Sequence, residues 1–309
     1  MIVVLAGGVG AAKFLEGLAA VMPPEQITVI ANTGDDAKFH GLHVSPDIDT
    51  VLYTLAGIVD RERGWGIAGD TFSCLQALRH LGRETWFQLG DRDLATHLTR
   101  TLRLRQGATL SEAIEELRHA LGVASQILPM SDAPARTRLR TTAGLLAFQE
   151  YFVKLRQEPE VLEAAFSEAT ACKPAPGVLE AITEAEGMIL APSNPILSIG
   201  PILAVPGIRE ALRNTAATVA AISPIVGGRA LRGPADRILT SLGLGASAAA
   251  VAELYRDFVD IFVLDLEDAS LREELERKGT KVIVTQTIMN SPEARQGLAR
   301  KVLEGLART

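Results

Sequence analysis

The sequence opens with MIVVLAGGVGAAKF (residues 1–14), in which a short apolar run leads into a glycine cluster and then a helix-forming segment. The unbroken apolar run Ile2–Ala6 is typical of a parallel strand that is covered on both faces. Glycines let a backbone approach a phosphate, and the N-terminus of the next helix offers free N–H groups. The stretch matches neither GxGxxG nor GxxxxGK[ST], so a plain turn is the alternative. Its place at the end of the first strand favours a phosphate site, with Lys13 adding a point charge.

Further apolar runs follow this stretch, and helical patterns lie between or after most of them. The runs are Ile27–Ala31, Met188–Ala191, Thr218–Ile222, Ile261–Leu264 and Val282–Thr285. The main helical patterns beside them are Ala11–Val21, Gly207–Asn214, Leu271–Lys278 and Ser291–Leu306. This alternation predicts an α/β fold with a doubly wound, mainly parallel sheet of about six strands.

The middle of the chain has a different pattern, because it contains helical periodicity without clear strands. The expected helices are Asp70–Leu81, Asp91–Arg105, Ser111–Leu121 and Thr142–Arg156. We therefore predict a core formed by residues 1–60 and 176–309, with residues 61–175 as a helix-rich insertion.

Composition excludes several classes of protein. With 47% hydrophobic and 22% charged residues over 309 positions, the chain is globular and not disordered. A net charge of −6 argues against a nucleic-acid partner, since phosphate backbones select basic surfaces. No apolar run approaches the ~20 residues that span a bilayer, which predicts no membrane association. Cys74 and Cys172 form no CxxC motif and the N-terminus resembles no signal peptide, so we expect a cytoplasmic protein.

Two acidic segments follow the second predicted strand. ANTGDD (31–36) lies at the same sheet edge as the glycine cluster, where Asn32 and Thr33 can donate hydrogen bonds and the two acids can hold ribose hydroxyls or a hydrated cation. In SPDIDT (45–50), Asp47 and Asp49 stand just inside a predicted helix start. They can cap free N–H groups, hold Mg²⁺ or orient an attacking hydroxyl, and the spacing does not choose among these roles.

Five more motifs are candidates for ligand contacts. In WGIAGDTF (65–72), Trp65 and Phe72 offer apolar surface for a ring system, and in LGDRDLATH (89–97), Arg92 can grip a phosphate or a ring carbonyl. A surface ion cluster beside a core tryptophan is the alternative, and a lone His97 is more often structural. In APSNPILSIGP (191–201), prolines flank Ser193 and Asn194 and stiffen a polar loop at the sheet edge. SPIVGG (223–228) and GPAD (233–236) repeat this pattern, and a plain turn is the alternative for each.

Together these motifs resemble the 2-phospho-L-lactate transferase family of deazaflavin coenzyme F-420 biosynthesis. The segments that carry the resemblance are GGVGAAKF (7–14), NTGDD (32–36), SPDIDTVLY (45–53), WGIAGDTF (65–72), LGDRDLATH (89–97), LPMSD (128–132), APSNPILSIGPIL (191–203), SPIVGG (223–228) and GPADR (233–237). Each is weak alone, but the ordered set is specific and extends over about three quarters of the chain.

The resemblance implies a Rossmann-like core with an inserted, largely helical subdomain that contributes to the deazaflavin site. It also implies transfer of 2-phospholactate or enolpyruvyl phosphate from a guanosine-diphospho-activated donor to the ribityl hydroxyl of 7,8-didemethyl-8-hydroxy-5-deazariboflavin (FO). GMP is released, Mg²⁺ is required, and a homodimer is suggested, for which the apolar segment Ala248–Tyr255 could supply an interface. The choice among lactyl, enolpyruvyl and glyceryl donors stays open.

The resemblance also implies roles for individual residues. The residues expected to hold the guanosine diphosphate part of the donor are Gly7, Gly8, Gly10, Lys13, Asn32, Thr33, Ser193 and Asn194. Asp47 and Asp49 are the expected catalytic residues and Mg²⁺ ligands, and which of them orients the hydroxyl stays open. The residues expected to contact FO are Asp49, Arg92, Trp65 and Phe72.

Two other functions compete with the transferase. A related family with similar glycine and acidic loops contains non-catalytic regulators that bind nucleotide sugars, and it lacks the SPDIDT and LGDRD segments. An NAD(P)-dependent oxidoreductase would show GxGxxG after the first strand and an acid at the end of the second. Here the loop is GGVGAAK and Asn32 ends the second strand, so the transferase is favoured.

Overall fold

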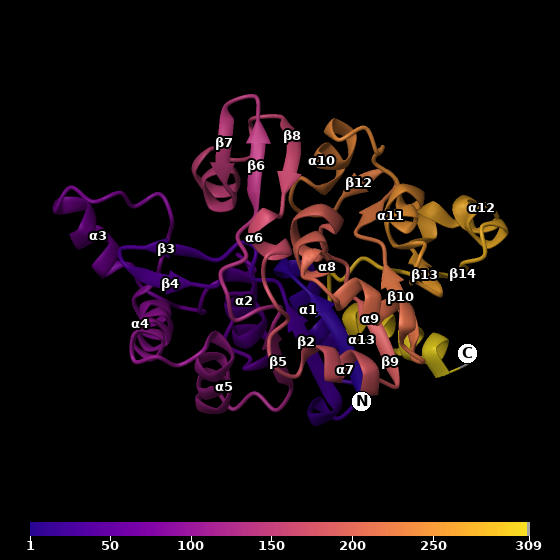
Figure 1. Cartoon of the computed structure of the whole chain (residues 1–309), viewed down its shortest axis with the longest axis horizontal. Coiled ribbons are helices and arrows are strands. Elements are labelled where there is room, and N and C mark those ends of the chain that lie inside the picture. The colour runs from indigo at the N-terminus through magenta and orange to yellow at the C-terminus, as the bar shows by residue number, and fades with distance from the viewer. Residues whose placement is uncertain (308–309) are drawn as a thin grey trace.

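The centre of the molecule is a seven-stranded parallel sheet in the computed structural model, which describes residues 1–307 (Figure 1). Its strand order is β14-β13-β10-β9-β1-β2-β5. The strands are β1 (Ile2–Ala6), β2 (Ile27–Ala31), β5 (Gln126–Pro129), β9 (Gly187–Leu190), β10 (Thr218–Ile222), β13 (Ile261–Leu264) and β14 (Lys281–Val284). The chain runs from β1 outward through β2 to β5, then returns and builds β9 to β14 on the other side, so strand order reverses between β1 and β9.

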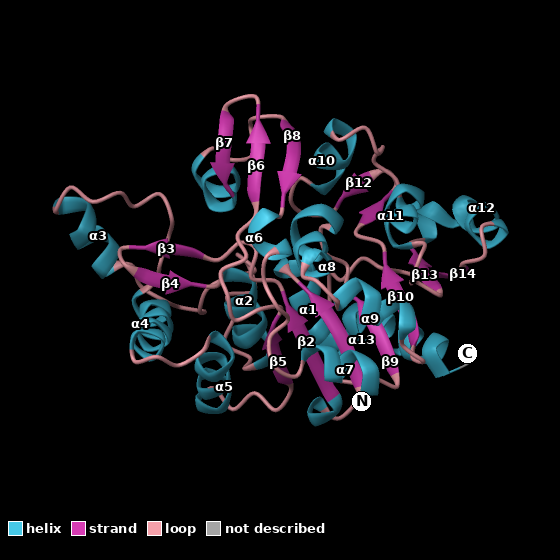
Figure 2. Cartoon of the chain, in the orientation of Figure 1, coloured by secondary structure: helices cyan, strands magenta, loops and turns pink. Residues whose placement is uncertain are grey.

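Helices cover both faces of this sheet because consecutive strand residues point to opposite sides (Figure 2). In β1, Val3 and Leu5 belong to one buried apolar cluster, whereas Val4 and Ala6 belong to the other. The helices α1 (Gly8–Ala19), α2 (Pro46–Leu55), α5 (Leu110–Ala120) and α13 (Pro292–Ala307) contribute to the second cluster. The helices α6 (Ser167–Thr170), α7 (Val178–Glu184), α8 (Gly200–Ala204), α9 (Ile208–Asn214), α10 (Ala235–Ser241), α11 (Ala248–Tyr255) and α12 (Arg272–Arg277) contribute to the first.

The doubly wound α/β prediction is confirmed, and all six predicted strands exist with bounds within one residue. The seventh strand, β5, was not predicted. It lies at the edge of the sheet and pairs only with β2, so it needs no long apolar run, and Pro129 breaks its pattern.

The segment between β2 and β9 carries the remaining elements. A hairpin of β3 (Ala37–Phe39) and β4 (Leu42–Val44) extends outward together with α3 (Ser73–His80) and α4 (Asp91–Arg105) (Figure 1). The domain boundaries at residues 60 and 175 stay a prediction.

The helix predicted over Thr142–Arg156 is wrong. This segment forms strand β7 (Gly144–Ala147) and one π-helical turn, Glu150–Lys154. With β6 (Arg138–Thr141) and β8 (Val161–Ala165), β7 makes a separate antiparallel three-stranded sheet. The apolar residues of Gly144–Ala147 fit a helix and a strand equally well, and pairing with β6 decides between them.

Two other features bear on partners. The apolar side of α11 packs into the core of its own chain through Val251, Ala252 and Tyr255, so the segment proposed for a dimer interface is largely covered already.

Among residues 1–307, no individual helix is long and apolar enough to cross a membrane. One pair of helices bent by 87°, Pro195–Ala204 with Ile208–Asn214, is long and apolar enough only when both are counted together. A short β11–β12 hairpin (Ile225–Val226 and Arg229–Ala230) leads into α10.

Candidate functional site

A cavity of about 1110 Å³ lies where the strand order reverses, at the carboxyl ends of β1, β9 and β10. Ligands of open α/β sheets bind at this position, because the loops there diverge and leave a crevice. The sequence-predicted residues that line it are Gly7, Gly8, Gly10, Lys13, Asp47, Asp49, Trp65, Ser193 and Asn194. Segments far apart in sequence therefore meet at one cavity.

The glycine turn packs closely against its neighbours, which explains why side chains are absent there. A Cβ on Gly10 would lie 2.3 Å from the carbonyl oxygen of Pro192, and one on Gly7 would lie 2.7 Å from the carboxylate of Asp47. Gly8 has a φ of +76°, a conformation that favours glycine. The turn therefore needs glycine at three positions to bring the start of α1 between β9 and α2.

Asp47 links the glycine turn to the second strand. Its Oδ1 accepts a hydrogen bond from the backbone N–H of Gly8 at 2.7 Å, and its Oδ2 accepts one from the Asn32 amide at 2.9 Å. The carboxylate thus caps α1 instead of its own helix α2, in which no side-chain cap is present. Burial raises the pKa of Asp47 to about 6, although the bonds from Asn32 and Gly8 act in the opposite direction.

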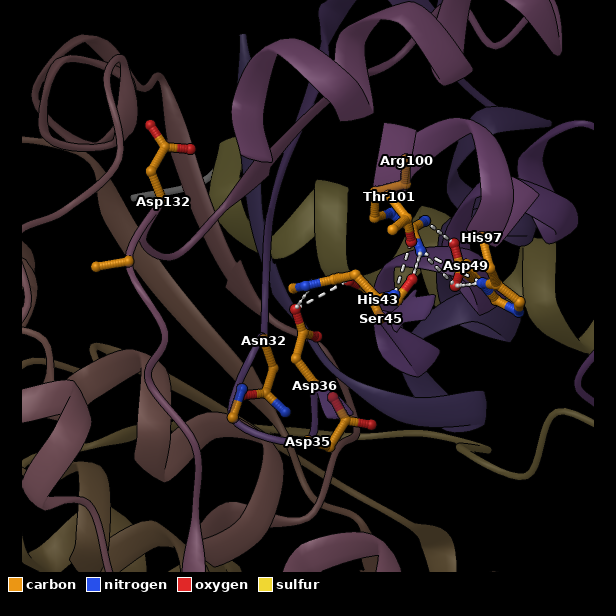
Figure 3. A network of polar contacts seen from close by, with 12 residues as sticks. Asn32, Asp35, Asp36, His43, Ser45, Asp49, His97, Arg100, Thr101 and Asp132 are labelled. Atoms are coloured by element: carbon orange, nitrogen blue, oxygen red, sulfur yellow. Dashed lines mark hydrogen bonds and ion pairs between the residues drawn. The ribbon is translucent and has the colours of Figure 1, made fainter. Parts of the chain in front are cut away.

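Asp49, two residues after Asp47 in α2, forms a buried ion pair with Arg100 of α4 (Figure 3). Arg100 is fully buried, and its Nη1 and Nη2 donate to Oδ2 and Oδ1 of Asp49, the first at 3.1 Å. Burial opposes the charge on Arg100, but the nearby Asp49 carboxylate outweighs it and raises the pKa of Arg100. Both oxygens of Asp49 are therefore engaged by one guanidinium, which fixes their orientation.

His97 lies between two carboxylates on the cavity wall. Its Nδ1 is 3.6 Å from Asp49 Oδ2, and its Nε2 is 3.1 Å from Asp93 Oδ1. Asp93 also accepts a hydrogen bond from the hydroxyl of Tyr53 at 2.7 Å. Burial alone would raise the pKa of Asp93, but His97 and Tyr53 outweigh burial and lower it. His97 is thus part of a buried polar network, a role that its isolated position in the sequence did not reveal.

Asp35 and Asp36 are buried beside this network. Asp36 Oδ2 accepts from Ser45 Oγ at 2.9 Å and lies 2.9 Å from His43 Nε2 (Figure 3). Asp35 lines the cavity, and its Oδ1 is buried without a hydrogen-bond partner in the described structure. Burial, together with the negative charges of Asp47 and Asp36, raises the pKa of Asp35 well above its usual range. Asp35 therefore favours either a proton or a bound cation beside it.

The remaining polar candidates differ in their surroundings. Ser193 is buried on the cavity wall, and its Oγ has no hydrogen-bond partner in the described residues. Asn194 Oδ1 accepts from the N–H groups of Ile196 and Leu197, both at 3.0 Å, so it caps the following π-helical turn. Asn32 and Thr33 are buried behind the cavity and do not line it. Asn32 therefore affects the cavity through its hydrogen bond to Asp47.

The predicted deazaflavin contacts are only partly brought together. Trp65 lines the cavity and stacks beside Arg63, whose Cζ lies 5.7 Å from its ring centre. Phe72 and Arg92 do not line the cavity; Arg92 is exposed, and its Nη1 donates to the carbonyl of Ala68 at 3.2 Å. Arg92 therefore contacts the loop that carries Trp65 and not the cavity itself.

A second aromatic group on the cavity wall was not predicted. Trp86, Phe87, Phe148 and Phe152 all line the cavity, and the rings of Phe148 and Phe152 stack with centres 5.3 Å apart. They come from the loop before α4 and from the segment that the sequence suggested was helical. They differ from ordinary core aromatic residues because the fold brings all four of them to one cavity.

The donor set can be compared with the needs of Mg²⁺. Across residues 1–307, no three His, Cys, Asp or Glu side chains are arranged to hold a metal ion. Mg²⁺ usually takes only one or two carboxylates and completes its shell with water and substrate phosphates. Asp35 and Asp47 fit this need, since Asp35 Oδ1 has no partner and both carboxyls have raised pKa values. Asp49 fits less well, because its partner Arg100 is a cation that would repel Mg²⁺, whereas the groups that donate to Asp47 are neutral. The role of Asp49 as a ligand stays a prediction.

The fold and the cavity define a doubly wound α/β protein whose ligand site lies at the strand-order reversal, the arrangement typical of nucleotide-binding enzymes. Residues 2–301 match the family described as 2-phospho-L-lactate transferase CofD. The chain belongs to this family and is a transferase of coenzyme F-420 biosynthesis.

Full-length relatives include a 2-phospho-L-lactate transferase from Methanothermobacter thermautotrophicus, 44% identical, with 98% of this chain and 97% of that protein covered. A phosphoenolpyruvate transferase from Streptomyces griseus is 45% identical, with the same coverage. Among solved structures, a UPF0052-family protein from Bacillus halodurans has a TM-score of 0.63 at 18% identity and covers 98% of both chains. The last likeness concerns the fold alone.

Proposed function

We propose that this enzyme transfers a phosphorylated three-carbon acid from a guanosine-diphospho-activated donor to the ribityl hydroxyl of FO, with release of GMP. The observation that carries the proposal is the meeting of three parts on one cavity: a glycine turn, a carboxylate cluster and an aromatic wall. Phosphoryl transfer depends on positioning and charge neutralisation, and these parts supply both.

The donor diphosphate binds at the glycine turn in this proposal. The start of α1 supplies backbone N–H groups near Gly8 and Gly10, and Lys13 supplies a positive charge. Ser193 Oγ, which has no hydrogen-bond partner among the described residues, can donate to a phosphate or ribose oxygen from the end of β9. The nucleoside part extends from this turn along the strand ends.

The deazaflavin ring binds between the aromatic side chains on the other side of the cavity. Phe148 and Phe152 offer a stacked apolar surface, and Trp86 and Trp65 line the same cavity. A planar tricyclic ring gains both apolar burial and aromatic contact there. We therefore add Phe148, Phe152 and Trp86 to the contacts expected from Trp65.

The chemical step follows from this placement. The ribityl hydroxyl attacks the phosphorus that bears the acid and releases its proton to solvent. A new O–P bond forms, and the bond from that phosphorus to the GMP phosphate oxygen breaks, so that GMP leaves with the bonding electrons. Asp49 accepts a hydrogen bond from the hydroxyl through a lone pair that Arg100 does not use, and so orients it. Asp35 and Asp47 are the proposed Mg²⁺ ligands, and the bound ion would offset the negative charge on the donor phosphates.

We also propose a homodimer, whose interface does not use the buried apolar face of α11. Light scattering on the purified chain measures this directly. A mass near 33 kDa would contradict the dimer, since one chain has a mass of 32.9 kDa.

Turnover with FO and Mg²⁺ tests the reaction, with lactyl, enolpyruvyl and glyceryl donors assayed in parallel and GMP followed by chromatography. FO-dependent GMP release supports the proposal, and the donor with the highest kcat/KM identifies the acid. GMP release at the same rate without FO, or no release with any donor, would contradict it. Relatives with both kinds of name share 44–45% identity with this chain, so identity alone does not choose the donor.

A further inference from the structure

Arg232 is a cavity residue whose position in the sequence gives no hint of a role. It lies in the loop between β12 and α10, and it lines the same cavity as the glycine turn. Its Nη2 donates to the backbone carbonyl of Arg63 at 2.8 Å, so it connects two loops that are 169 residues apart.

The guanidinium of Arg232 fits into a space that a glycine leaves open. A Cβ on Gly64 would lie 2.3 Å from Arg232 Nη1 and 2.8 Å from Val9 Cγ1. Val9 belongs to the glycine turn, so Arg232 lies where its own loop, the loop of residues 60–66 and that turn meet. One hydrogen bond to a carbonyl leaves other N–H groups of the guanidinium available.

The positive charges at this junction favour a bound anion. Among residues 1–307, neither Lys13 nor Arg232 has a carboxylate within 4.0 Å, whereas the nearby cations Arg61 and Arg295 both pair with Glu16. Burial lowers the pKa of Lys13, and the positive charges of Arg295 and Arg232 lower it further. Two cations without carboxylate partners face one cavity beside the free N–H groups of α1, and together they favour a doubly charged ligand.

We propose that Arg232 binds the diphosphate of the donor together with Lys13, and that its bond to the Arg63 carbonyl holds the guanidinium in place for this contact. The inference rests on the proposed function and adds a residue to its donor site. A guanidinium suits the task because its fixed fork of donors matches phosphate oxygens. Arg232 acting only as a link between two loops is the competing explanation.

The experiment compares Arg232→Ala and Arg232→Lys with Arg229→Ala, a control on the adjoining strand β12 that is exposed and does not line the cavity. Isothermal titration with GDP and steady-state turnover with the activated donor are measured on the full chain. We expect Arg232→Ala to weaken GDP binding and raise KM for the donor by about 10- to 100-fold, the range for one charge-assisted contact. Arg232→Lys recovers part of the loss, and millimolar guanidinium chloride restores part of the turnover of Arg232→Ala.

A second pair of variants tests the position of the guanidinium without removing its charge. Gly64→Ala displaces Arg232, whereas Gly57→Ala has the same kind of positive φ, +72°, with nothing within 4 Å of the added Cβ. We expect Gly64→Ala, and not Gly57→Ala, to weaken GDP binding. The double variant Gly64→Ala/Arg232→Ala should bind GDP no more weakly than Arg232→Ala alone, because both changes act on one contact.

The possible outcomes separate this inference from the proposed function. If Arg232→Ala binds GDP as tightly as Arg229→Ala does, or loses turnover without a change in GDP affinity and without guanidinium rescue, Arg232 only links the loops and the inference is wrong. If the wild-type chain binds GDP through Arg232 but releases no GMP from any donor, the diphosphate contact stands and the proposed reaction fails.

Discussion

Removal of the Arg100 side chain should be strongly destabilising, because it leaves the carboxylate of Asp49 buried without its partner. Arg100 is fully buried and donates to both oxygens of Asp49 and, at 3.4 Å, to the carbonyl of His43. Breaking a buried ion pair by removing one partner costs about 3–5 kcal/mol. Asp36 is close enough for its charge to raise the pKa of Arg100, so the negative charge left behind is not isolated. We therefore expect Arg100→Ala to lower the free energy of unfolding by at least about 3 kcal/mol.

Thermal unfolding measures this loss. With an unfolding entropy of about 2.1 cal/mol/K per residue, 309 residues give roughly 0.65 kcal/mol/K, so 3–5 kcal/mol lowers Tm by roughly 5–8 °C. Arg105→Ala is the matched control, because Arg105 is exposed on the same helix and donates to one carbonyl, that of Gly41, at 3.3 Å. It should change the free energy of unfolding by no more than about 0.5 kcal/mol.

A double variant separates the ion pair from the simple loss of packing. Asp49→Leu/Arg100→Met removes both charges and fills much of their volume, so it should recover most of the stability that Arg100→Ala loses. The reasoning is refuted if Arg100→Ala unfolds within about 1 kcal/mol of the wild type, or if the double variant is less stable than the single one.

Four further outcomes follow from the site. Gly10→Ala should cost about 1–3 kcal/mol and weaken GDP binding, since its Cβ would lie 2.3 Å from the Pro192 carbonyl; unchanged melting and GDP titration would contradict this. Asp47→Asn should abolish turnover, as measured by GMP release, and its stability relative to wild type should rise between about pH 4 and pH 6. The sign follows because a raised folded-state pKa, about 6, makes ionisation of Asp47 destabilising as pH increases; melting curves that keep a constant difference would contradict it. Phe148→Ala should weaken FO binding by roughly 2- to 10-fold, followed by absorbance titration, and leave GDP binding unchanged. Arg92→Ala should weaken FO binding less than Trp65→Ala does, because Arg92 contacts only the loop; an equal or larger loss would assign Arg92 to the deazaflavin site.

The main sheet could be predicted from the sequence because parallel strands are covered on both faces. Each predicted strand is a run of apolar residues with no more than one threonine. In Ile2–Ala6 the run is unbroken, and every residue of that strand is buried. Helix α4 was predicted with its observed bounds, since Asp91 marks its first turn and a long polar-apolar pattern follows. The three-stranded sheet could not be predicted, because its strands are short and β7 is largely exposed, so tertiary pairing and not local pattern forms it.

The glycine turn and the acidic loops were also within reach of sequence reasoning, because they follow predicted strands and must meet at one sheet edge. The hydrogen bonds and ion pairs that these residues form could not be predicted in the same way. Nothing in the order of residues indicates that Arg100 engages Asp49 across 51 positions, or that Asp47 caps α1. Such contacts depend on how α2 and α4 pack, and single residues at helix faces carry no local signal for it.

The contacts of Asp47 and Asp49 differ, although the two aspartates look equivalent in SPDIDT. Asp47 faces the glycine turn and accepts from Gly8 and Asn32, so its position is set by the phosphate side of the cavity. Asp49, two residues on, faces α4 and is held by Arg100, so its position is set by the packing of α4. Residues two apart on a helix point in different directions, so in the mechanism proposed above Asp47 would face the donor phosphates and Asp49 the acceptor hydroxyl. A shift of α2 would move both carboxylates together, which ties the placement of the donor phosphates to the placement of the attacking hydroxyl.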